Sequence, residues 1–427
     1  MENLQTLHTF LNRARETMPW EKRREHLDRR LTVALTHAYE QSKAYRERFD
    51  AAGMDVSNIR GLEDLETVPI LRMSELVQCQ AADPPFGGFN TVNPEDLHRI
   101  YVNPGFILQP GERQFEDTSW AEALSGAGFT AGDRLINTFN YHLWPFAFMM
   151  DESVRMINGT VVPTGVGNTM MQVRIMQKLR VNGYVGTPSF LMNIVQRAEG
   201  MGVDFQRDMV LKKAIVGAEM LPESMRLRLE EKLKMTIREA YGTVLSGCIG
   251  YECAHMTGLH VPDNMVVEVV DPHTGKGVKE GAVGEIVVTN FNRVFPMIRL
   301  ATGDLSMVIH QACPCGRTGP MLKKIMGRTD QATKVRGTFI HPWQADEVIG
   351  RYPEIFKYQV VITREELGDV MTFVVELKEE TVETGVICAR MERDIKDNLT
   401  VRGGVRIVPR GTIPDFHKKI DDRRTWQ

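Results

Sequence analysis

The sequence predicts an α/β protein with a large N-terminal domain and a small C-terminal α+β domain, and three observations support this prediction. The chain has 427 residues, which is long for one domain. From Leu97 onward, strand-like and helix-like segments alternate, as they do in a parallel sheet flanked by helices. After Gly327 the pattern changes to a separate set of strands and helices, about one hundred residues long. We therefore expect domains at residues 1–327 and 328–427, with the boundary at Arg328–Asp330.

Hydrophobic spacing predicts the individual elements. Before Leu97 the chain reads as helical, because apolar residues such as Leu31 and Leu35 recur among charged ones. The segments that read as strands of a parallel sheet are DRLINTF, TVVPTG, GYVGTPSF and LKKAIVGAEM. Helices are expected at Met170–Leu179, in the segment ending at Ala198, and in PESMRLRLEEKL. From Gly250 to Met307 short strands predominate, which indicates a β subdomain with mixed sheets. In the C-terminal domain we expect strands at Tyr358–Ile362, Met371–Leu377 and Val405–Val408, and helices at HPWQADEVIG and Cys388–Asn398.

Composition narrows the class of protein. Hydrophobic residues make up 42% and charged residues 25% of the chain, which is ordinary for a globular protein. The formal net charge of −3 gives no reason to expect a nucleic-acid partner. The longest apolar run, Trp144–Met150, is too short to cross a membrane, and the charged N-terminus does not resemble a secretory signal. Six cysteines in a chain of this length do not indicate a disulfide scaffold. We expect a cytoplasmic enzyme.

Four residues have the composition of a closed zinc site. Cys253 and His260 are close in sequence in ECAHMTGLH, and Cys313 and Cys315 form a CPC motif. Three thiolates and one imidazole are a common ligand set for structural zinc. The spacing matches no standard zinc finger, His255 is a competing imidazole, and four unrelated buried residues are the alternative.

Three short motifs suit a nucleotide. Gly217, Ala218 and Glu219 follow an apolar strand, where exposed main chain suits an adenine edge; the alternative is a strand-to-helix turn with Glu219 near a helix N-terminus. In EAYGTV, after a further short strand, Tyr241 beside Gly242 could cover a purine and Thr243 could reach a phosphate; a buried core tyrosine is the alternative. The last motif combines TGD, whose Asp304 suits ribose hydroxyls, with Arg328, which suits a phosphate or can brace a moving segment.

Taken together and in order, these segments resemble the adenylate-forming acyl-CoA ligases, and most closely the phenylacetate-CoA ligase family. The resemblance extends along nearly the whole chain, and its densest part is Gly281–Gly337. It implies that ATP and a carboxylate form an acyl-adenylate, from which coenzyme A displaces AMP. It also implies Mg²⁺, a small mobile C-terminal domain and often a homodimer. Some relatives resembling this subfamily also carry a metal at the Cys/His positions.

The resemblance assigns further residues. Lys419, which follows GTIP near the C-terminus, matches the lysine that reaches the carboxylate and the α-phosphate, and Lys418 is one step out of register; a solvated basic tail is the alternative. An apolar loop would receive an aromatic or hydrophobic acid, and its residues are Phe139, Tyr141 and Trp144.

The chain departs from the family pattern in two places. The family's phosphate-binding loop corresponds to Ile100–Glu116, which contains no serine, threonine or lysine, although Gly105, Gly111 and Arg113 could substitute. Leu245 replaces a glutamate that helps to hold Mg²⁺, and leucine cannot bind a hard cation. Three functions therefore compete: an acyl- or aryl-CoA ligase, a non-catalytic AMP- or acyl-AMP-binding protein, and an enzyme that transfers the adenylate to another acceptor.

Overall fold

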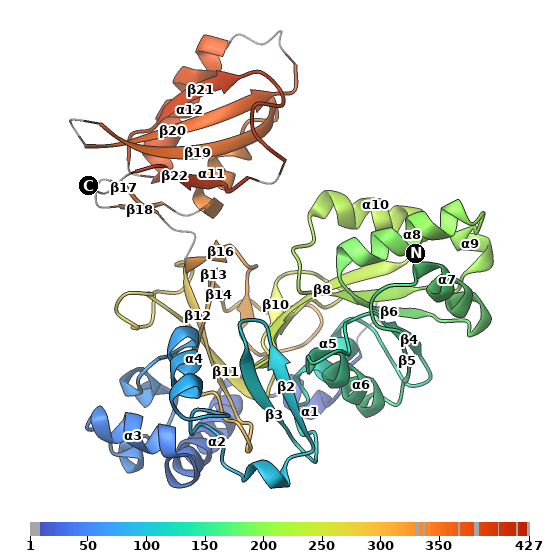
Figure 1. Ribbon diagram of the computed structural model, residues 1–427, viewed down its shortest axis with the longest axis vertical. Helices are drawn as coiled ribbons and strands as arrows, with labels where there is room; N and C mark the ends of the chain where they lie inside the picture. The colour runs from blue at the N-terminus through green and yellow to red at the C-terminus, as the bar shows by residue number, and fades with distance from the viewer. Residues whose placement is uncertain are drawn as a thin grey trace. The chain divides into compact units, whose positions relative to one another are not determined.

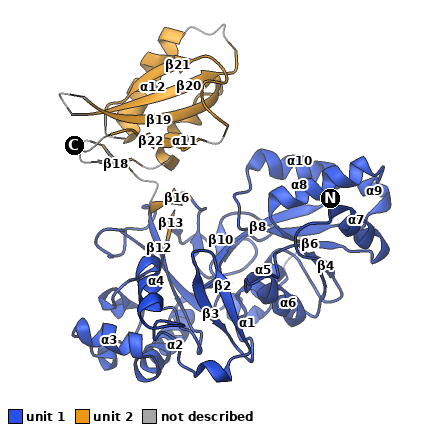
Figure 2. Ribbon diagram, viewed as in Figure 1, with its two compact units in different colours: residues 1–302, 306–325 blue, residues 303–305, 326–427 orange. Residues whose placement is uncertain are grey.

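The computed structural model describes residues 9–329, 333–335, 338–340, 342–365, 368–379, 384–399, 401–415 and 417–424. These residues form two compact units (Figure 2). The first comprises residues 1–302 and 306–325, and the second comprises residues 303–305 and 326–427.

Helices open the first unit (Figure 1): α1 (Arg13–Glu16), α2 (Trp20–Gln41), α3 (Lys43–Ala51) and α4 (Met73–Ala82). Helix α2 buries one stripe formed by Leu27, Leu31, Leu35 and Ala38, as expected for spacings of three and four. Ser42 separates α2 from α3, and its hydroxyl accepts a hydrogen bond from the Tyr45 amide at 3.3 Å. The helical character expected for this region is confirmed.

The largest sheet has nine strands in the order β14-β15-β10-β9-β8-β7-β6-β4-β5. Strands β5, β4, β6, β7 and β8 are parallel to their neighbours, and β9 returns antiparallel to β8. The strand bounds are β4 Arg134–Asn137, β5 Thr160–Pro163, β6 Gly183–Gly186, β7 Lys213–Val216, β8 Thr236–Thr243, β9 Gly247–Tyr251, β10 Leu259–His260, β14 Val308–Ile309 and β15 Met321–Leu322. The helices between them are α5 Ser119–Gly126, α6 Phe146–Met156, α7 Thr169–Lys178, α8 Pro188–Gly200, α9 Phe205–Asp208 and α10 Glu223–Leu233. The predicted alternation of strand and helix is confirmed.

A second sheet forms the expected β subdomain. Its order is β1-β13-β12-β11, with bounds β1 Leu71–Arg72, β11 Met265–Val270, β12 Gly284–Asn290 and β13 Leu300–Ser306; β16 (Gly327–Arg328) pairs with β13. Arg299, just before β13, is 2% exposed, and its guanidinium pairs with Glu268 at 2.8 Å. It also donates to the carbonyls of Val68 and Gly275, so that this one side chain joins three segments distant in sequence.

The segment that matches the family's phosphate loop is a β-hairpin. Strands β2 (Arg99–Asn103) and β3 (Ile107–Gly111) pair from Arg99 opposite Gly111 to Asn103 opposite Ile107. The tight turn between them contains Pro104–Phe106.

In the second unit, a mixed sheet packs against two helices. The sheet order is β21-β20-β19-β22, and the bounds are β19 Ile355–Glu365, β20 Gly368–Leu377, β21 Gly404–Val408, β22 Ile420–Asp422, α11 Pro342–Ile349 and α12 Thr384–Leu399. Strands β19 and β20 are antiparallel, and each pairs in parallel with its outer neighbour. A short pair, β17 (Thr333–Val335) and β18 (Thr338–Ile340), precedes α11. The strands and helices predicted here from spacing are confirmed. Asp330, where we expected the boundary to end, lies outside the described residues.

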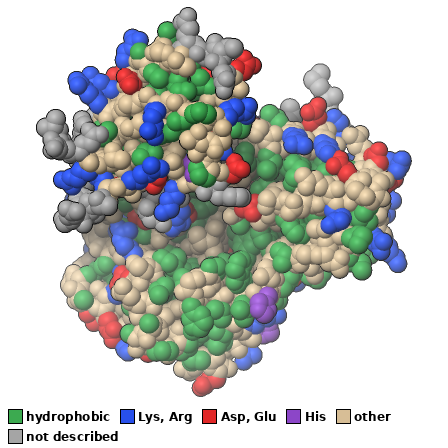
Figure 3. Space-filling view, turned by 45° about the horizontal axis from the view of Figure 1, so that its top comes forward, with side chains coloured by type: hydrophobic (Ala, Val, Ile, Leu, Met, Phe, Trp, Pro, Cys, Tyr) green, Lys and Arg blue, Asp and Glu red, His purple; other side chains and the backbone are tan. Residues whose placement is uncertain are grey.

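Charge is distributed without a strong bias. On the face shown in Figure 3, the described acidic and basic side chains are interspersed, and neither sign forms a continuous patch. Among the described residues, no helix combines the length and the apolar composition needed to cross a membrane.

Candidate active site and metal centre

The two segments expected to hold adenine lie side by side. Gly217 follows β7, and β7 pairs in parallel with β8, which carries Tyr241. A Cβ added to Gly217 would lie 2.6 Å from the Ala240 carbonyl oxygen, so only glycine allows this approach of the two main chains. The structure therefore places both segments at the carboxyl ends of adjacent parallel strands, where α/β proteins commonly bind ligands.

Ala218 and Glu219 form a turn with a structural contact of its own. Ala218 has φ +64, which is uncommon for a residue other than glycine. The Glu219 carboxylate accepts hydrogen bonds from the Ser189 hydroxyl at 2.9 Å and the Ser189 amide at 3.4 Å, in the first turn of α8. This matches the alternative in which Glu219 serves a helix N-terminus, and it leaves the main chain of Gly217 and Ala218 as the part suited to adenine.

Tyr241, Gly242 and Thr243 are the last residues of β8, whereas the sequence suggested that they follow a shorter strand. The strand extends further because β9 pairs back onto it. Tyr241 is half-buried against the β subdomain core, and the Thr243 hydroxyl accepts from the Ser246 amide at 3.1 Å. A Cβ on Gly242 would collide with the Gly247 carbonyl at 2.3 Å, which explains the glycine there.

Asp304 and Arg328 are paired. They are register partners on β13 and β16, and the Arg328 guanidinium lies 2.9 Å from the Asp304 carboxylate. The structure thus brings together, within the second unit, the two residues expected to hold ribose and α-phosphate.

Lys419 lies directly before β22, and its ammonium is held by Asp346 of α11. Both Asp346 carboxylate oxygens are 2.6 Å from the Lys419 Nζ, and the Tyr358 hydroxyl donates to the same carboxylate at 2.5 Å. The main chain of Lys418 is fixed separately, since its carbonyl accepts from the Gln359 side chain at 2.9 Å. Nothing in the spacing of the sequence indicated Asp346 as the partner.

The residues expected to receive the acid lie around the start of α6. The Phe139 ring packs edge-on against Phe146 at 4.3 Å. The Tyr141 hydroxyl donates to Asp151 at 2.7 Å, and its ring meets Phe148 at 5.3 Å. Trp144 is 40% exposed.

The three residues considered as substitutes in the phosphate-binding segment do not converge. Gly105 is in the hairpin turn, whereas Gly111 is four residue pairs away at the open end, about 13 Å along the strand. The Arg113 guanidinium donates to the Asp96 carbonyl at 2.7 Å, also beyond the open end. The hairpin therefore holds Gly105 apart from Gly111 and Arg113, so the three residues do not form a single phosphate cradle.

Leu245 belongs to the hydrophobic core beneath this hairpin. It is 5% exposed, and its backbone carbonyl accepts a hydrogen bond from the side-chain amide of Asn290 at 2.9 Å. The residues present do not fit Mg²⁺ at this position, because a buried leucine replaces the carboxylate.

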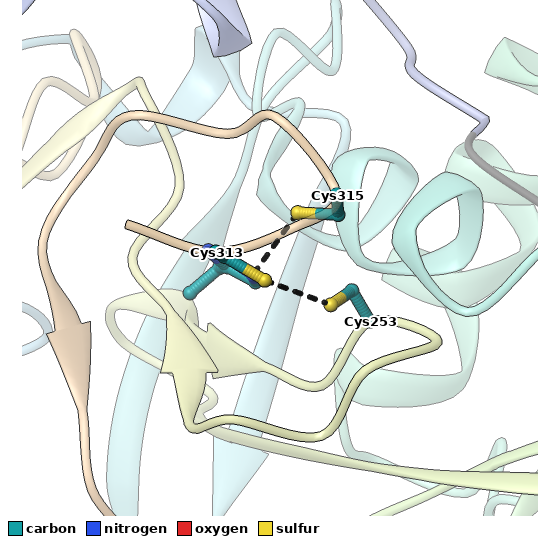
Figure 4. A group of neighbouring side chains, drawn as sticks. Cys253, Cys313 and Cys315 are labelled. Carbon is teal, nitrogen blue, oxygen red and sulfur yellow. Dashed lines mark hydrogen bonds between the residues drawn. The ribbon is translucent and has the colours of Figure 1, made fainter. Parts of the chain in front are cut away.

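The four predicted metal ligands converge. Cys253, His260, Cys313 and Cys315 are all buried, and their ligand atoms lie within 4.8 Å of one another. Figure 4 shows the three cysteine sulfurs pointing toward a common centre. The Cys253 and Cys313 sulfurs are 3.6 Å apart, and the Cys315 sulfur is 3.5 Å from His260 Nε2. These distances are close to the edges of a zinc tetrahedron, about 3.8 Å between sulfurs and about 3.5 Å between sulfur and nitrogen.

The surroundings suit thiolates. The His255 amide donates to Cys253 Sγ at 3.4 Å, and the Thr257 hydroxyl donates to Cys313 Sγ at 3.3 Å. The pKa of the Cys315 thiol is lowered to about 2, because a hydrogen bond from Cys253 and then His260 stabilise its thiolate. Of the two candidate imidazoles, the structure places His260 in the cluster. The role of Thr257 was missed, although it lies between two of the predicted ligands in sequence.

Comparisons with known proteins agree with this geometry. The family model described as AMP-binding enzyme matches residues 118–294, and the model described as AMP-binding enzyme C-terminal domain matches residues 337–424. A phenylacetate-coenzyme A ligase of Thermus thermophilus is 32% identical, and the alignment covers 93% of this chain and 95% of that protein. This chain belongs to the phenylacetate-CoA ligase family.

Other relatives extend the same comparison. A phenylacetate-coenzyme A ligase of Escherichia coli is 28% identical, with 90% of each chain covered. A crystal structure of 2-hydroxyisobutyryl-CoA ligase, in an open conformation with 2-HIB-AMP and CoA, shares the fold with a TM-score of 0.81 at 24% identity, covering 96% of this chain and 93% of that one. A postadenylation structure of that ligase gives a TM-score of 0.73 at 25% identity, covering 96% and 92%. The phenylacetate-CoA ligase fold therefore extends over nearly the entire chain.

Proposed function

We propose that this protein is an acyl- or aryl-CoA ligase that forms AMP and works through an acyl-adenylate. The close approach of Gly217 to the Ala240 carbonyl carries the proposal, because it leaves main chain beside Tyr241 at the carboxyl end of the parallel strands, where an adenine edge can lie. The family relationship over 93% of the chain supports the same reaction.

Each proposed residue has one task. The main chain of Gly217 and Ala218 meets the adenine edge, and Tyr241 covers the purine face. The Asp304 carboxylate accepts hydrogen bonds from the ribose hydroxyls, and the Arg328 guanidinium neutralises the charge of the α-phosphate. The remaining positions assigned to the nucleotide are Glu219, Gly242 and Thr243.

Lys419 acts on charge that forms during the reaction. A carboxylate oxygen of the acid attacks the α-phosphorus, and the bond to pyrophosphate breaks. The thiol of coenzyme A then attacks the acyl carbon, the bond to AMP breaks, and the thiol proton is released. The Lys419 ammonium stabilises the negative charge that develops at the α-phosphate in the first step.

The acid is aromatic or hydrophobic in this proposal. Phe139, Tyr141 and Trp144 supply apolar ring surface, and the rings of Phe146 and Phe148 extend it.

A second candidate is a protein that binds AMP or acyl-AMP with impaired adenylation, and the hairpin favours it. The segment Ile100–Glu116 offers no serine, threonine or lysine, and Leu245 is buried in the core. Each charge-assisted hydrogen bond that the β- and γ-phosphates do not receive costs ATP ~1.5–3 kcal/mol of binding free energy. AMP has neither phosphate, so its affinity is unaffected. Transfer of the adenylate to an acceptor other than coenzyme A is the third possibility.

Calorimetry and pyrophosphate exchange together test the proposal. We expect AMP to bind at least as tightly as ATP with Mg²⁺, and exchange to depend on one acid from an aromatic and hydrophobic panel. AMP binding without exchange for any acid would favour the second candidate. Tight Mg²⁺-dependent ATP binding with rapid turnover would show that other groups hold the β- and γ-phosphates, and the expected preference for AMP would then be wrong.

We also propose that Cys253, His260, Cys313 and Cys315 hold a structural zinc ion. The buried donor set and its spacings support this proposal. Four protein ligands leave no open position for water, so the metal would join two chain segments and take no part in the reaction.

The family relationship supports a proposal for the quaternary and cellular setting. We propose that the protein is a homodimer in the cytoplasm. Its cysteines are free thiols, which suits a reducing compartment. Residues 328–427 act as a C-terminal domain that swings about a hinge at Arg328 and carries Lys419 with it.

A further inference from the structure

A cavity lies in the first unit, and its walls include Gly111 and Arg113 of the segment that matches the family's phosphate loop, together with Leu245. Its volume is about 530 Å³, which is large enough for a small metabolite. The walls are the hairpin β2–β3, one face of α6, the turn after β8 and the ranges 112–117 and 290–293. None of the residues proposed for adenine, ribose or zinc lines it, and of the rings proposed for the acid only Phe148 does.

Two arginines in the wall are held in place by aromatic rings. The Arg30 guanidinium lies 4.3 Å over the Phe291 ring, and the Arg99 guanidinium lies 4.5 Å over the Phe148 ring. Within the described part of the chain, neither guanidinium has a carboxylate at ion-pair distance. Burial, and then the nearby Arg15, lower the pKa of Arg30, so this charge is desolvated without a direct counterion. Stacked guanidiniums present their N–H edges to carboxylates or phosphates.

Hydrogen-bond acceptors lie in the same cavity wall. The Glu112 carboxylate accepts a hydrogen bond from the side-chain amide of Asn292. The Asp117 carboxylate accepts one from the side-chain amide of Asn264 at 2.8 Å. Burial raises the pKa of Glu112 to about 7, as does the charge of Asp117. The Ser246 hydroxyl, on a residue 3% exposed, has no hydrogen-bond partner among the described residues. Buried polar groups without partners are rare, and a ligand bound in the cavity would give this hydroxyl a partner.

We propose that this cavity binds a small organic anion that also carries hydroxyl groups, either a phosphate monoester or a hydroxycarboxylate. Its acidic group binds Arg30, with Arg99 as the second guanidinium. Its hydroxyl groups donate to Glu112 and Asp117, and one of its polar atoms pairs with Ser246. Binding here does not require the proposed ligase activity.

Calorimetry on the full chain, at constant ionic strength and with AMP saturating, tests this site. The probes are glycerol 3-phosphate for the phosphate monoesters, malate for the hydroxycarboxylates, and glycerol as the uncharged comparison. We expect one of the two anions to bind with a Kd below about 1 mM, and glycerol not to bind. Arg30→Gln should weaken that anion at least tenfold.

Arg29→Gln is the matched control, because Arg29 is the exposed neighbour of Arg30 on α2 and does not line the cavity. It should change the Kd less than twofold. Without ligand, Arg30→Gln should keep or raise the Tm, since it removes a desolvated charge; if it fails to fold, Arg99→Gln replaces it. Absence of binding by both anions at 10 mM (about ten times the expected Kd), equal losses in the two arginine variants, or displacement of the anion by AMP would each overturn the proposal.

Discussion

At the scale of single residues, the main question is how Lys419 is held when no reaction occurs. Its ion pair with Asp346 is short, yet the two side chains are 45% and 43% exposed. Exposed pairs contribute about 1 kcal/mol or less, because water screens them. Breaking the pair therefore costs little, so the contact with Asp346 is compatible with the role that we propose for Lys419.

The role of Lys419 leads to a prediction about two adjacent lysines. Lys419→Ala should reduce acid-dependent pyrophosphate exchange about a hundredfold or more, because it removes a cation that acts on developing charge. AMP affinity should change less than threefold. Lys418→Ala is the matched control and should retain exchange. Equal losses in both variants would show that the basic tail contributes only general charge.

The raised pKa of Glu122, in α5, leads us to expect that the stability of the protein depends on pH. It is buried beside Tyr251 and Asp263, and burial, followed by the charges of Asp263 and Glu16, raises its pKa from 4.5 to about 8. Between these two pH values the folded protein keeps a proton that the unfolded chain releases. The stabilisation of the folded state by this retained proton is therefore fully present below pH 4.5 and is lost as pH rises toward about 8.

Urea unfolding of wild type and Glu122→Gln at several pH values between 6 and 8 measures this effect. Because glutamine does not titrate, the variant should gain stability relative to wild type as pH rises, by up to about 1 kcal/mol per pH unit. The exposed Glu21→Gln is the control and should show a constant difference. A constant difference for Glu122→Gln as well would contradict the burial argument.

At the scale of elements, the Cys/His cluster compensates for short strands. His260 lies in β10, which has two residues, and Cys313 and Cys315 lie in the loop between β14 and β15, which have two residues each. Such strands bury little surface, and a metal would join the loops that connect them.

We predict one zinc ion per chain in the purified protein. Cys313→Ser should lose the metal and lower the Tm by about 5–10 °C, because the ligand set is broken. Cys248→Ser alters a buried cysteine outside the cluster and should keep the zinc whatever its Tm. Elemental analysis with thermal melts gives both values, and wild-type protein without zinc would refute the site.

At the scale of the whole molecule, the chain passes into the second unit briefly at residues 303–305 and then permanently between residues 325 and 326. The segment there contains Lys323, Lys324 and Arg328, and all three are exposed. Linkers between domains are weakly packed, so proteases reach them first.

Limited trypsin digestion should therefore cut first between residues 323 and 334 and leave two persistent fragments, which mass spectrometry can identify. Digestion of protein unfolded in urea is the control and should show no preferred first site. A first cut inside the parallel sheet or inside the sheet of the second unit would contradict the predicted division at Arg328.

Much of the fold could be predicted from the sequence because the signals are local. The spacing of apolar residues in α2 and the apolar strands before Gly217 depend on neighbouring positions only. The convergence of Cys253, His260, Cys313 and Cys315 could also be predicted, since three cysteines and a histidine in two short segments form a ligand set typical of structural zinc. The hairpin at Ile100–Glu116 could not, because strand pairing depends on partners that the local pattern does not specify.

By itself, the sequence determined which residue types are available: residues suited to adenosine, a lysine after GTIP, three cysteines and a histidine suited to a metal, and no serine, threonine or lysine in Ile100–Glu116. Tertiary structure decided what each side chain contacts. It paired Lys419 with Asp346, chose His260 over His255, and separated Gly105 from Arg113. These outcomes depend on contacts between residues far apart in the chain, and such contacts exist only once the sheets have formed.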